Sequence, residues 1–286
     1  MPFNPMKKYL FPLSILLALQ ACETDADIEL PAIDPMLSAT CFISPQDTVL
    51  TATVNRVNPL FGDEQDIPYV IDNATVIISN GLQSVSFTYD GNAFNYKLDP
   101  SLMPIESGQT YTLRIEAPGY PAWTASTTVP QVAVENVSAQ VLSISSPQDE
   151  FQSNYNVEIE MAWDDVSVEN STYRGAVVYR DTLDFDGYQQ IYNTEVVTFL
   201  EDDGETAQGR IRKIQTGNVY LPEVDNPNSF YFFLLHVNKD YYTFHKSLEN
   251  MNYGSPFSEP TLVYTNASGG LGCFGAFQQT SVVVSP

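Results

Sequence analysis

The sequence predicts an all-β protein, and three observations lead to that prediction. Apolar and polar residues alternate over many short segments, as in strands that bury one face of a sheet. Turn-forming pairs such as Asn80-Gly81 and Pro118-Gly119 separate these segments. Only one segment after the N-terminal apolar run has helical spacing. We therefore expect an N-terminal immunoglobulin-like sandwich, followed by a second antiparallel β-sandwich or partly open barrel with one inserted helix.

The first predicted domain covers residues 34–130. Its expected strands are 36–43, 48–54, 74–79, 84–89, 94–98, 110–117 and 123–129. Tyr111, Leu113 and Ile115 share one face of their strand, because successive side chains in a strand point to opposite sides. Short strands at this spacing are typical of an immunoglobulin-like sandwich, and Pro130 marks its predicted end.

The second predicted domain covers residues 131–286. Alternation restarts at Val132 and Val134, and the apolar residues of 157–163 share one face while the polar residues share the other. Further strands are expected at 173–180, 191–200, 209–214, 230–237 and 278–284. Many antiparallel strands with polar turns favour a second sandwich or a partly open barrel.

The inserted helix is expected near residues 239–251. Tyr242, His245 and Leu248 recur there at three-residue spacing, and Asn238 is a suitable N-cap because its side chain can accept from the first free backbone amides.

The N-terminus has the features of a secretory signal. Lys7 and Lys8 precede an apolar run at 9–19 that is too short to span a membrane. The run ends in Leu19-Gln20-Ala21-Cys22, which resembles the bacterial lipobox, although Gln20 departs from its usual small residue. We expect residues 1–21 to be removed and Cys22 to carry the lipid. The alternative is an ordinary signal peptide or membrane helix with an incidental cysteine.

Residues 22–33 are expected to form an acidic tether. The stretch Glu23-Thr24-Asp25-Ala26-Asp27 resembles the surface-export signal of Bacteroidetes lipoproteins. A solvated linker, which any lipoprotein needs, is the alternative. The tether favours surface display on the outer membrane over a periplasm-facing position.

The chain is strongly acidic, with a formal net charge of -23. This charge argues against nucleic-acid binding, which needs a basic surface, and against direct binding to anionic lipid. It favours solubility and a cationic partner or bound cations. The membrane is therefore expected to be reached through the lipid on Cys22.

Two cysteines, Cys41 and Cys273, follow the expected lipidation site. An oxidising compartment would permit a disulfide between them, which would join the two ends of the mature chain. Two buried free thiols are an equally good interpretation.

The sequence contains no recognisable catalytic constellation. His236 and His245 are the only histidines, and their spacing matches no known metal motif. The acidic stretches 184–187 and 201–205 could hold calcium, but solvated hairpin turns are the preferred interpretation of both. We expect no catalytic residue, no cofactor and no metal site.

Aromatic residues cluster late in the second domain and provide a candidate binding surface. Insertions in a β scaffold often carry recognition, so we assign the candidate partner or ligand surface to the helix region. Its members are Tyr241, Tyr242, His245, Tyr253 and Phe257.

Several motifs together resemble an uncharacterised family of Bacteroidetes lipoproteins, domain of unknown function 4249. They include 108–113, Thr128-Val129-Pro130, Trp163-Asp164-Asp165, Asn238-Lys239-Asp240-Tyr241-Tyr242 and the glycine-rich stretch 269–276. The resemblance implies an outer-membrane lipoprotein often encoded beside a TonB-dependent receptor, with no established activity. Cys273 departs from the apolar or aromatic residue expected between those glycines, which favours a special role for it, such as a bridge to Cys41.

The glycines of this stretch also have a direct physical interpretation. They permit positive φ and close backbone approach, so a bulged, tightly packed strand turn is expected rather than a ligand loop.

Three functions follow from these observations. The first is a non-enzymatic, lipid-anchored accessory protein that binds an outer-membrane TonB-dependent receptor in nutrient uptake or envelope assembly. The second is a lipoprotein that binds a glycan, a peptide or a metal. The third, with the least support, is a hydrolase that uses a carboxylate pair.

Overall fold

The computed structural model describes residues 34–57, 69–145, 154–164, 166, 171–185, 188–202, 210–215, 219–220, 229–249 and 262–284. All of these except Asp34 belong to one compact unit, Pro35–Asn58 with Asp66–Pro286. The predicted signal, Cys22, the acidic tether, Tyr253 and Phe257 lie outside the described residues.

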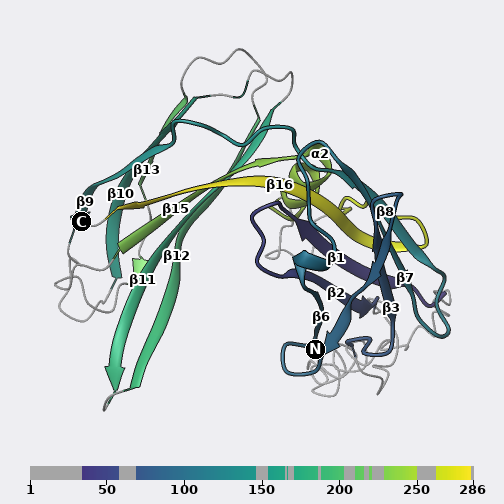
Figure 1. Cartoon of the computed structure of the whole chain (residues 1–286). Coiled ribbons are helices and arrows are strands. Elements are labelled where there is room, and N and C mark those ends of the chain that lie inside the picture. Colours follow the sequence, from purple (N-terminus) through teal and green to yellow (C-terminus); the bar gives the residue numbers. More distant parts are fainter. Residues whose placement is uncertain are drawn as a thin grey trace, which may run out of the picture. The chain divides into compact units, whose positions relative to one another are not determined.

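The all-β prediction is confirmed, because strands and one α-helix account for most of the described chain (Figure 1). The strands of the first half are β1 (Leu37–Ile43), β2 (Leu50–Arg56), β3 (Thr75–Ser79), β4 (Ser84–Ser86), β5 (Thr88–Asp90), β6 (Asn95–Leu98), β7 (Thr110–Glu116) and β8 (Trp123–Thr128). Those of the second half are β9 (Ser138–Ser145), β10 (Asn154–Trp163), β11 (Thr172–Phe185), β12 (Tyr188–Asp202), β13 (Arg210–Gln215), β14 (Val219–Tyr220), β15 (Ser229–Val237) and β16 (Gly270–Val284). A short 3-10 helix, η1, covers Pro100–Leu102.

The first sandwich packs β1, β2, β6 and β5 against the sheet β4-β3-β7-β8. Alternation drives this packing: every second residue of β1 and β2 is buried, and β3 and β7 follow the same pattern. The two sheets share one core that includes Leu37, Tyr96 and Trp123. The Tyr96 hydroxyl donates to the carbonyl of Ile71 at 2.9 Å, which satisfies its polar end inside the core.

The predicted strand 84–89 is two strands in the structure. β4 pairs with β3 in one sheet, whereas β5 pairs with β6 in the other. Phe87 lies between them, is buried, and donates its backbone amide to Val76. The chain crosses between the layers at this corner, which a continuous alternating pattern does not reveal.

The second sandwich packs β12-β11-β15 and the end of β16 against β9, β10, β13 and β14. Trp163, Tyr173 and Phe232 are among its fully buried residues. The alternation that restarts with Val132, Val134 and Val137 leads into β9, which the structure has at Ser138–Ser145. Val134 is buried as part of the connection that precedes β9.

The last strand, β16, belongs to both sandwiches. Gly270–Ala276 pairs in parallel with β1, and Phe277–Val284 pairs antiparallel with β15. The result is one eight-stranded sheet in the order β12-β11-β15-β16-β1-β2-β6-β5. The predicted strand 278–284 therefore begins much earlier, at Gly270, since the glycines at its start obscure the strand pattern.

Glycines allow β16 to approach its neighbours closely. A Cβ on Gly272, which has φ +106°, would lie 1.9 Å from the carbonyl oxygen of Ala39 on β1. A Cβ on Gly269 would lie 2.1 Å from the carbonyl oxygen of Ala122. The tightly packed backbone expected from these glycines is confirmed.

The predicted helix is confirmed as α2, Lys239–Glu249. Asn238 is its N-cap, since its side-chain oxygen accepts from the Tyr241 amide at 3.1 Å. The Asn238 backbone amide also donates to the carbonyl of Ala276, so the cap fixes the helix start to β16. No helix in the described ranges is long and apolar enough to cross a membrane.

Candidate functional site

Aromatic and basic side chains gather between α2 and the sheet beneath it. We call Phe42, Arg174, Tyr241, Phe244 and His245 the α2 cluster. Tyr241 is only 4% exposed, and its ring lies 4.8 Å from that of Phe42 and 4.3 Å from that of His245. The structure thus brings Tyr241 and His245 together as the sequence suggested, but Tyr241 faces the interior rather than an open surface.

Arg174 connects β11 to the helix. Its guanidinium donates to the Tyr241 hydroxyl at 2.7 Å and lies 5.9 Å from the centre of that ring. Burial is the main cause that raises the pKa of Tyr241, so this hydroxyl stays protonated at neutral pH. Sequence analysis did not identify Arg174, because it lies in an alternating strand far from the helix in sequence.

His245 is held neutral inside the α2 cluster. Burial, and then the nearby charge of Arg174, lower its pKa from 6.5 to about 4. Its Nε2 atom is buried without a hydrogen-bond partner among the described residues. An imidazole with this pKa is a weak proton acceptor at neutral pH, so a packing role accounts for it better than general-base chemistry.

The titration of His245 should be visible in the pH dependence of the free energy of unfolding. The unfolded chain binds the proton more readily, so the contribution of His245 is complete above about pH 6.5 and is lost as the pH falls toward 4. We expect the free energy of unfolding of wild type to fall relative to that of His245→Phe over this window. Denaturant unfolding of both proteins between pH 7 and pH 4 measures it. Acidic groups titrate in both proteins and cancel, so a constant difference would contradict the assignment.

Cys41 and Cys273 are both buried free thiols, and the bridge between them is not formed. The register explains why. Thr40 is the partner of Cys273, and Cys41 is the partner of Phe274. Partners across a parallel ladder point to the same side, so the two thiols point to opposite faces. Cys41 lies in the sandwich core, whereas Cys273 Sγ lies 3.6 Å from the carbonyl oxygen of Asp240 in α2.

Both thiols should be unreactive in the folded protein. Burial raises the pKa of Cys41 well above its usual value and that of Cys273 to about 12. Because the thiolate is the reactive form, we expect iodoacetamide at pH 8 to label both at least about a hundredfold faster in guanidinium than in native buffer. Mass spectrometry of the labelled peptides measures this. Rapid native labelling, or denatured labelling that requires a reductant, would contradict the structure.

The other residues that the sequence analysis considered lie outside the α2 cluster. Tyr242 is partly buried and packs beside the α2 cluster. His236 is 6% exposed, and its Nδ1 lies 2.7 Å from the carbonyl oxygen of Val132, to which it donates. Glu201 is ion-paired with Arg212 at 3.1 Å. The described part of the chain contains no group of three or more potential metal-binding side chains.

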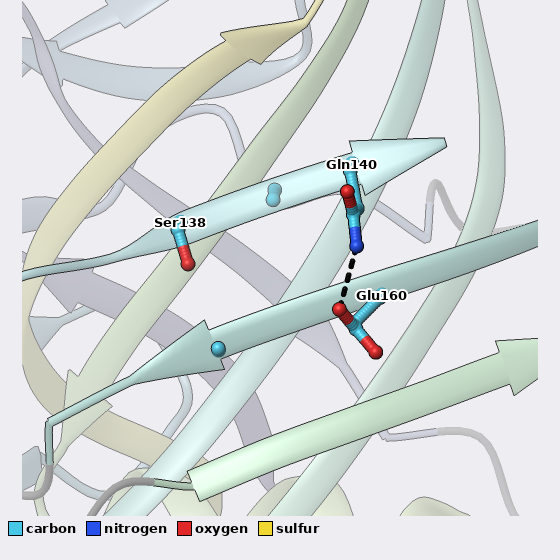
Figure 2. Close-up of a pocket in the computed structure, with 5 residues that line it drawn as sticks. Ser138, Gln140 and Glu160 are labelled. Atoms are coloured by element: carbon cyan, nitrogen blue, oxygen red, sulfur yellow. Dashed lines mark hydrogen bonds between the residues drawn. The ribbon is translucent and has the colours of Figure 1, made fainter. Parts of the chain in front are cut away.

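A small polar depression lies on the outer face of the second sandwich (Figure 2). It has a volume of about 170 Å³ and is lined by Ser138, Ala139, Gln140, Glu160 and Ala162. Gln140 donates to Glu160 at 2.6 Å, and Lys213 lies 3.1 Å from the same carboxylate. These partners lower the pKa of Glu160, so it remains ionised. A carboxylate held in this way is a fixed charge rather than a general acid.

The comparison with protein families identifies the chain. The model of the family described as a domain of unknown function, DUF4249, matches residues 23–282. The chain belongs to the DUF4249 family. The match extends across both sandwiches and α2, so the DUF4249 domain includes nearly all of the described residues. It also confirms the resemblance drawn from the ordered motifs.

Other comparisons add little to the DUF4249 assignment. No curated protein matches the chain. Two solved structures of Salmonella alpha-2-macroglobulin, one of a mutant and one of the protein reacted with methylamine, align at 6% and 7% identity. They cover 91% and 90% of this chain, which spans only 15% of each of those chains. The TM-score is 0.24 in both, so nothing about fold or function follows from them.

Proposed function

We propose that this DUF4249 protein is a lipid-anchored, non-enzymatic accessory protein of a bacterial outer membrane. The observation that carries the proposal is Leu19-Gln20-Ala21-Cys22 at the end of a short apolar run preceded by two lysines. Two or three acyl chains on Cys22 would anchor the protein stably, since each buried methylene contributes about 0.8 kcal/mol. The acidic body would then stay off the anionic membrane surface.

The proposed partner is a TonB-dependent outer-membrane receptor of a Bacteroidetes cell. This part rests on what the family resemblance implies about its members. The chemistry of the described residues supports binding over catalysis: His245 is neutral, both buried thiols are protonated, and Glu160 is fixed by two partners. The polar depression of about 170 Å³ is smaller than the roughly 300 Å³ or more typical of small-molecule sites, so this depression does not itself support the second candidate, a ligand-binding lipoprotein.

Replacing Cys22 tests the proposal. We expect Cys22→Ala to move the protein from the membrane fraction to the soluble envelope fraction and to abolish co-purification of the receptor from native membranes. Cys41→Ala is the matched control, because it removes a cysteine from the core and leaves the lipobox intact. The proposal fails if the Cys22→Ala protein still fractionates with the membrane and retains the receptor at native abundance.

Surface display is a separate part of the proposal. We expect protease added to intact cells to remove the protein. Replacing Glu23, Asp25 and Asp27 by their amides should protect it, because the acidic stretch is the proposed export signal. Equal cleavage of both proteins would show that these charges do not direct display.

A further inference from the structure

One flank of the second sandwich has no further strand among the residues that the structure describes. β9 pairs with β10 on one side, and no described residue pairs with its other side. From Phe277 onward, β16 pairs with β15, and its other side has no strand partner among the described residues, although the Gln279 amide there donates to the Gln46 side chain at 3.2 Å. The connection that leads into β9 lies against β16, where the Thr280 hydroxyl donates to the carbonyl of Val134 at 2.7 Å. The flank is therefore bounded by two unpaired strand edges, one from each layer.

Apolar side chains along this flank are only partly covered. They pack against the core of the second sandwich but are not fully buried, unlike Val157 and Ile159 on neighbouring β10, which are 0% exposed. The partly covered residues are Val137, Ala139, Val141, Ile144, Val282 and Val284. An additional strand along β9 would cover them and would satisfy the free backbone groups of the edge.

The β9 edge lacks the charges that usually protect an exposed edge. Ser138–Ser145 contains neither a charged residue nor a proline. Its only interruption is a bulge at Leu142, which is 39% exposed. Three other edges are protected: β4 has three residues, β5 contains Asp90, and β8 is bridged through Thr124 to Ser268. Along β9 an added strand would meet no such barrier.

The charges beside β9 indicate what kind of strand would fit. Glu158 and Glu160 lie next to it on the outer face of β10, and Glu135 and Asp164 lie near its start. Lys213 is paired with Glu160 and neutralises only that one of the four carboxylates. The flank is thus acidic, within a chain of formal charge -23. A second copy of the chain or its own acidic tether would be repelled, whereas a basic segment would be attracted.

We propose that the β9 edge binds an extended segment of a partner protein in which apolar residues alternate with lysine or arginine. The segment adds as a strand beside β9. Its apolar side chains cover Val141, Ile144 and Val282, and its long basic side chains extend across the outer face of β9 toward Glu158 and Glu160 on β10. This inference rests on the proposed function, because it supplies the surface by which the anchored protein would hold its partner.

A synthetic ten-residue peptide that alternates valine and lysine is the probe. We expect it to bind the full-length chain, purified in detergent, with saturable fluorescence anisotropy and to slow amide hydrogen exchange in 138–145. Binding should weaken as salt is raised, because charge contributes to it. A peptide that alternates valine and glutamate should not bind. The inference is overturned if the valine-lysine peptide fails to saturate or protects another segment.

Ser143→Lys provides the decisive variant. It places a cation on the exposed face of β9, and we expect it to weaken peptide binding about tenfold. Ser84→Lys, the same change on the exposed edge strand β4, should leave binding within about twofold. If Ser143→Lys lowers the melting temperature, Gln140→Lys repeats the test at a second exposed position. Equal effects at Ser143 and Ser84 would overturn the inference.

Three other outcomes bear on this inference and on the proposed function separately. Concentration-dependent protection of 138–145 without peptide would mean that a second copy occupies the edge, which overturns the inference. If the peptide does not bind but the receptor still co-purifies through the Cys22 anchor, the inference fails and the proposed function stands. If the peptide binds but the receptor is not retained, only the proposed function fails.

Discussion

Trp123→Ala is expected to lower the free energy of unfolding by about 4 kcal/mol, the range typical of a large aromatic side chain removed from a core. Trp123 is 0% exposed in the first sandwich. Its indole Nε1 donates to the carbonyl of Leu271 at 2.8 Å, and its ring packs where a side chain on Gly270 would otherwise lie. The substitution therefore removes core volume and a contact that joins β8 to β16.

Urea unfolding measures this loss, and two conservative variants separate its causes. Trp123→Phe should lower the free energy of unfolding more than Trp163→Phe does, although both rings are fully buried. The first change leaves the Leu271 carbonyl without its donor. The second removes an indole nitrogen that has no partner among the described residues. Equal losses in the two phenylalanine variants would mean that the bond to Leu271 contributes nothing.

Gly272→Ala is expected to destabilise the protein by about 3 kcal/mol or more. Its Cβ would lie 1.9 Å from the carbonyl oxygen of Ala39, and the φ of +106° is itself unfavourable for alanine. Because Gly272 pairs with Ala39 across the parallel junction, the strain would separate β16 from β1.

Gly119→Ala is the matched control for this prediction. Gly119 also has a positive φ, +83°, but its added Cβ meets nothing within 4 Å. Gly119→Ala should therefore lower the free energy of unfolding by only about 1 kcal/mol, the cost of a positive φ at alanine. The midpoints of guanidinium unfolding compare the two variants. The close-packing explanation is wrong if both variants shift the midpoint equally.

The candidate site shows where sequence reasoning reached its limit. Helical spacing and Asn238 located α2 and its cap, and the helix covers Lys239–Glu249 as expected. The same pattern could not show that Tyr241 would turn inward, because its partners Phe42 and Arg174 come from strands far away in the sequence. Periodicity reports which residues share a face, and tertiary packing decides what that face contacts.

The cysteines illustrate the same limit from another direction. Their positions near the two ends of the mature chain allowed either a disulfide or two thiols. The choice depends on strand register, since a shift of one residue moves a side chain to the other face of a sheet. With Cys41 opposite Phe274, the two sulfur atoms lie on opposite faces of the sheet and are not bonded to each other.

The sequence by itself determined the all-β class, the positions of most strands, the capped helix and the family, because alternation, turn residues and ordered motifs are local signals. The tertiary structure alone decided that β16 completes both sandwiches, that the segment 84–89 divides between two sheets, and that β9 has a strand partner on only one side within the described ranges. Each of these depends on pairing between segments distant in the chain, and local residue patterns contain little information about such pairing.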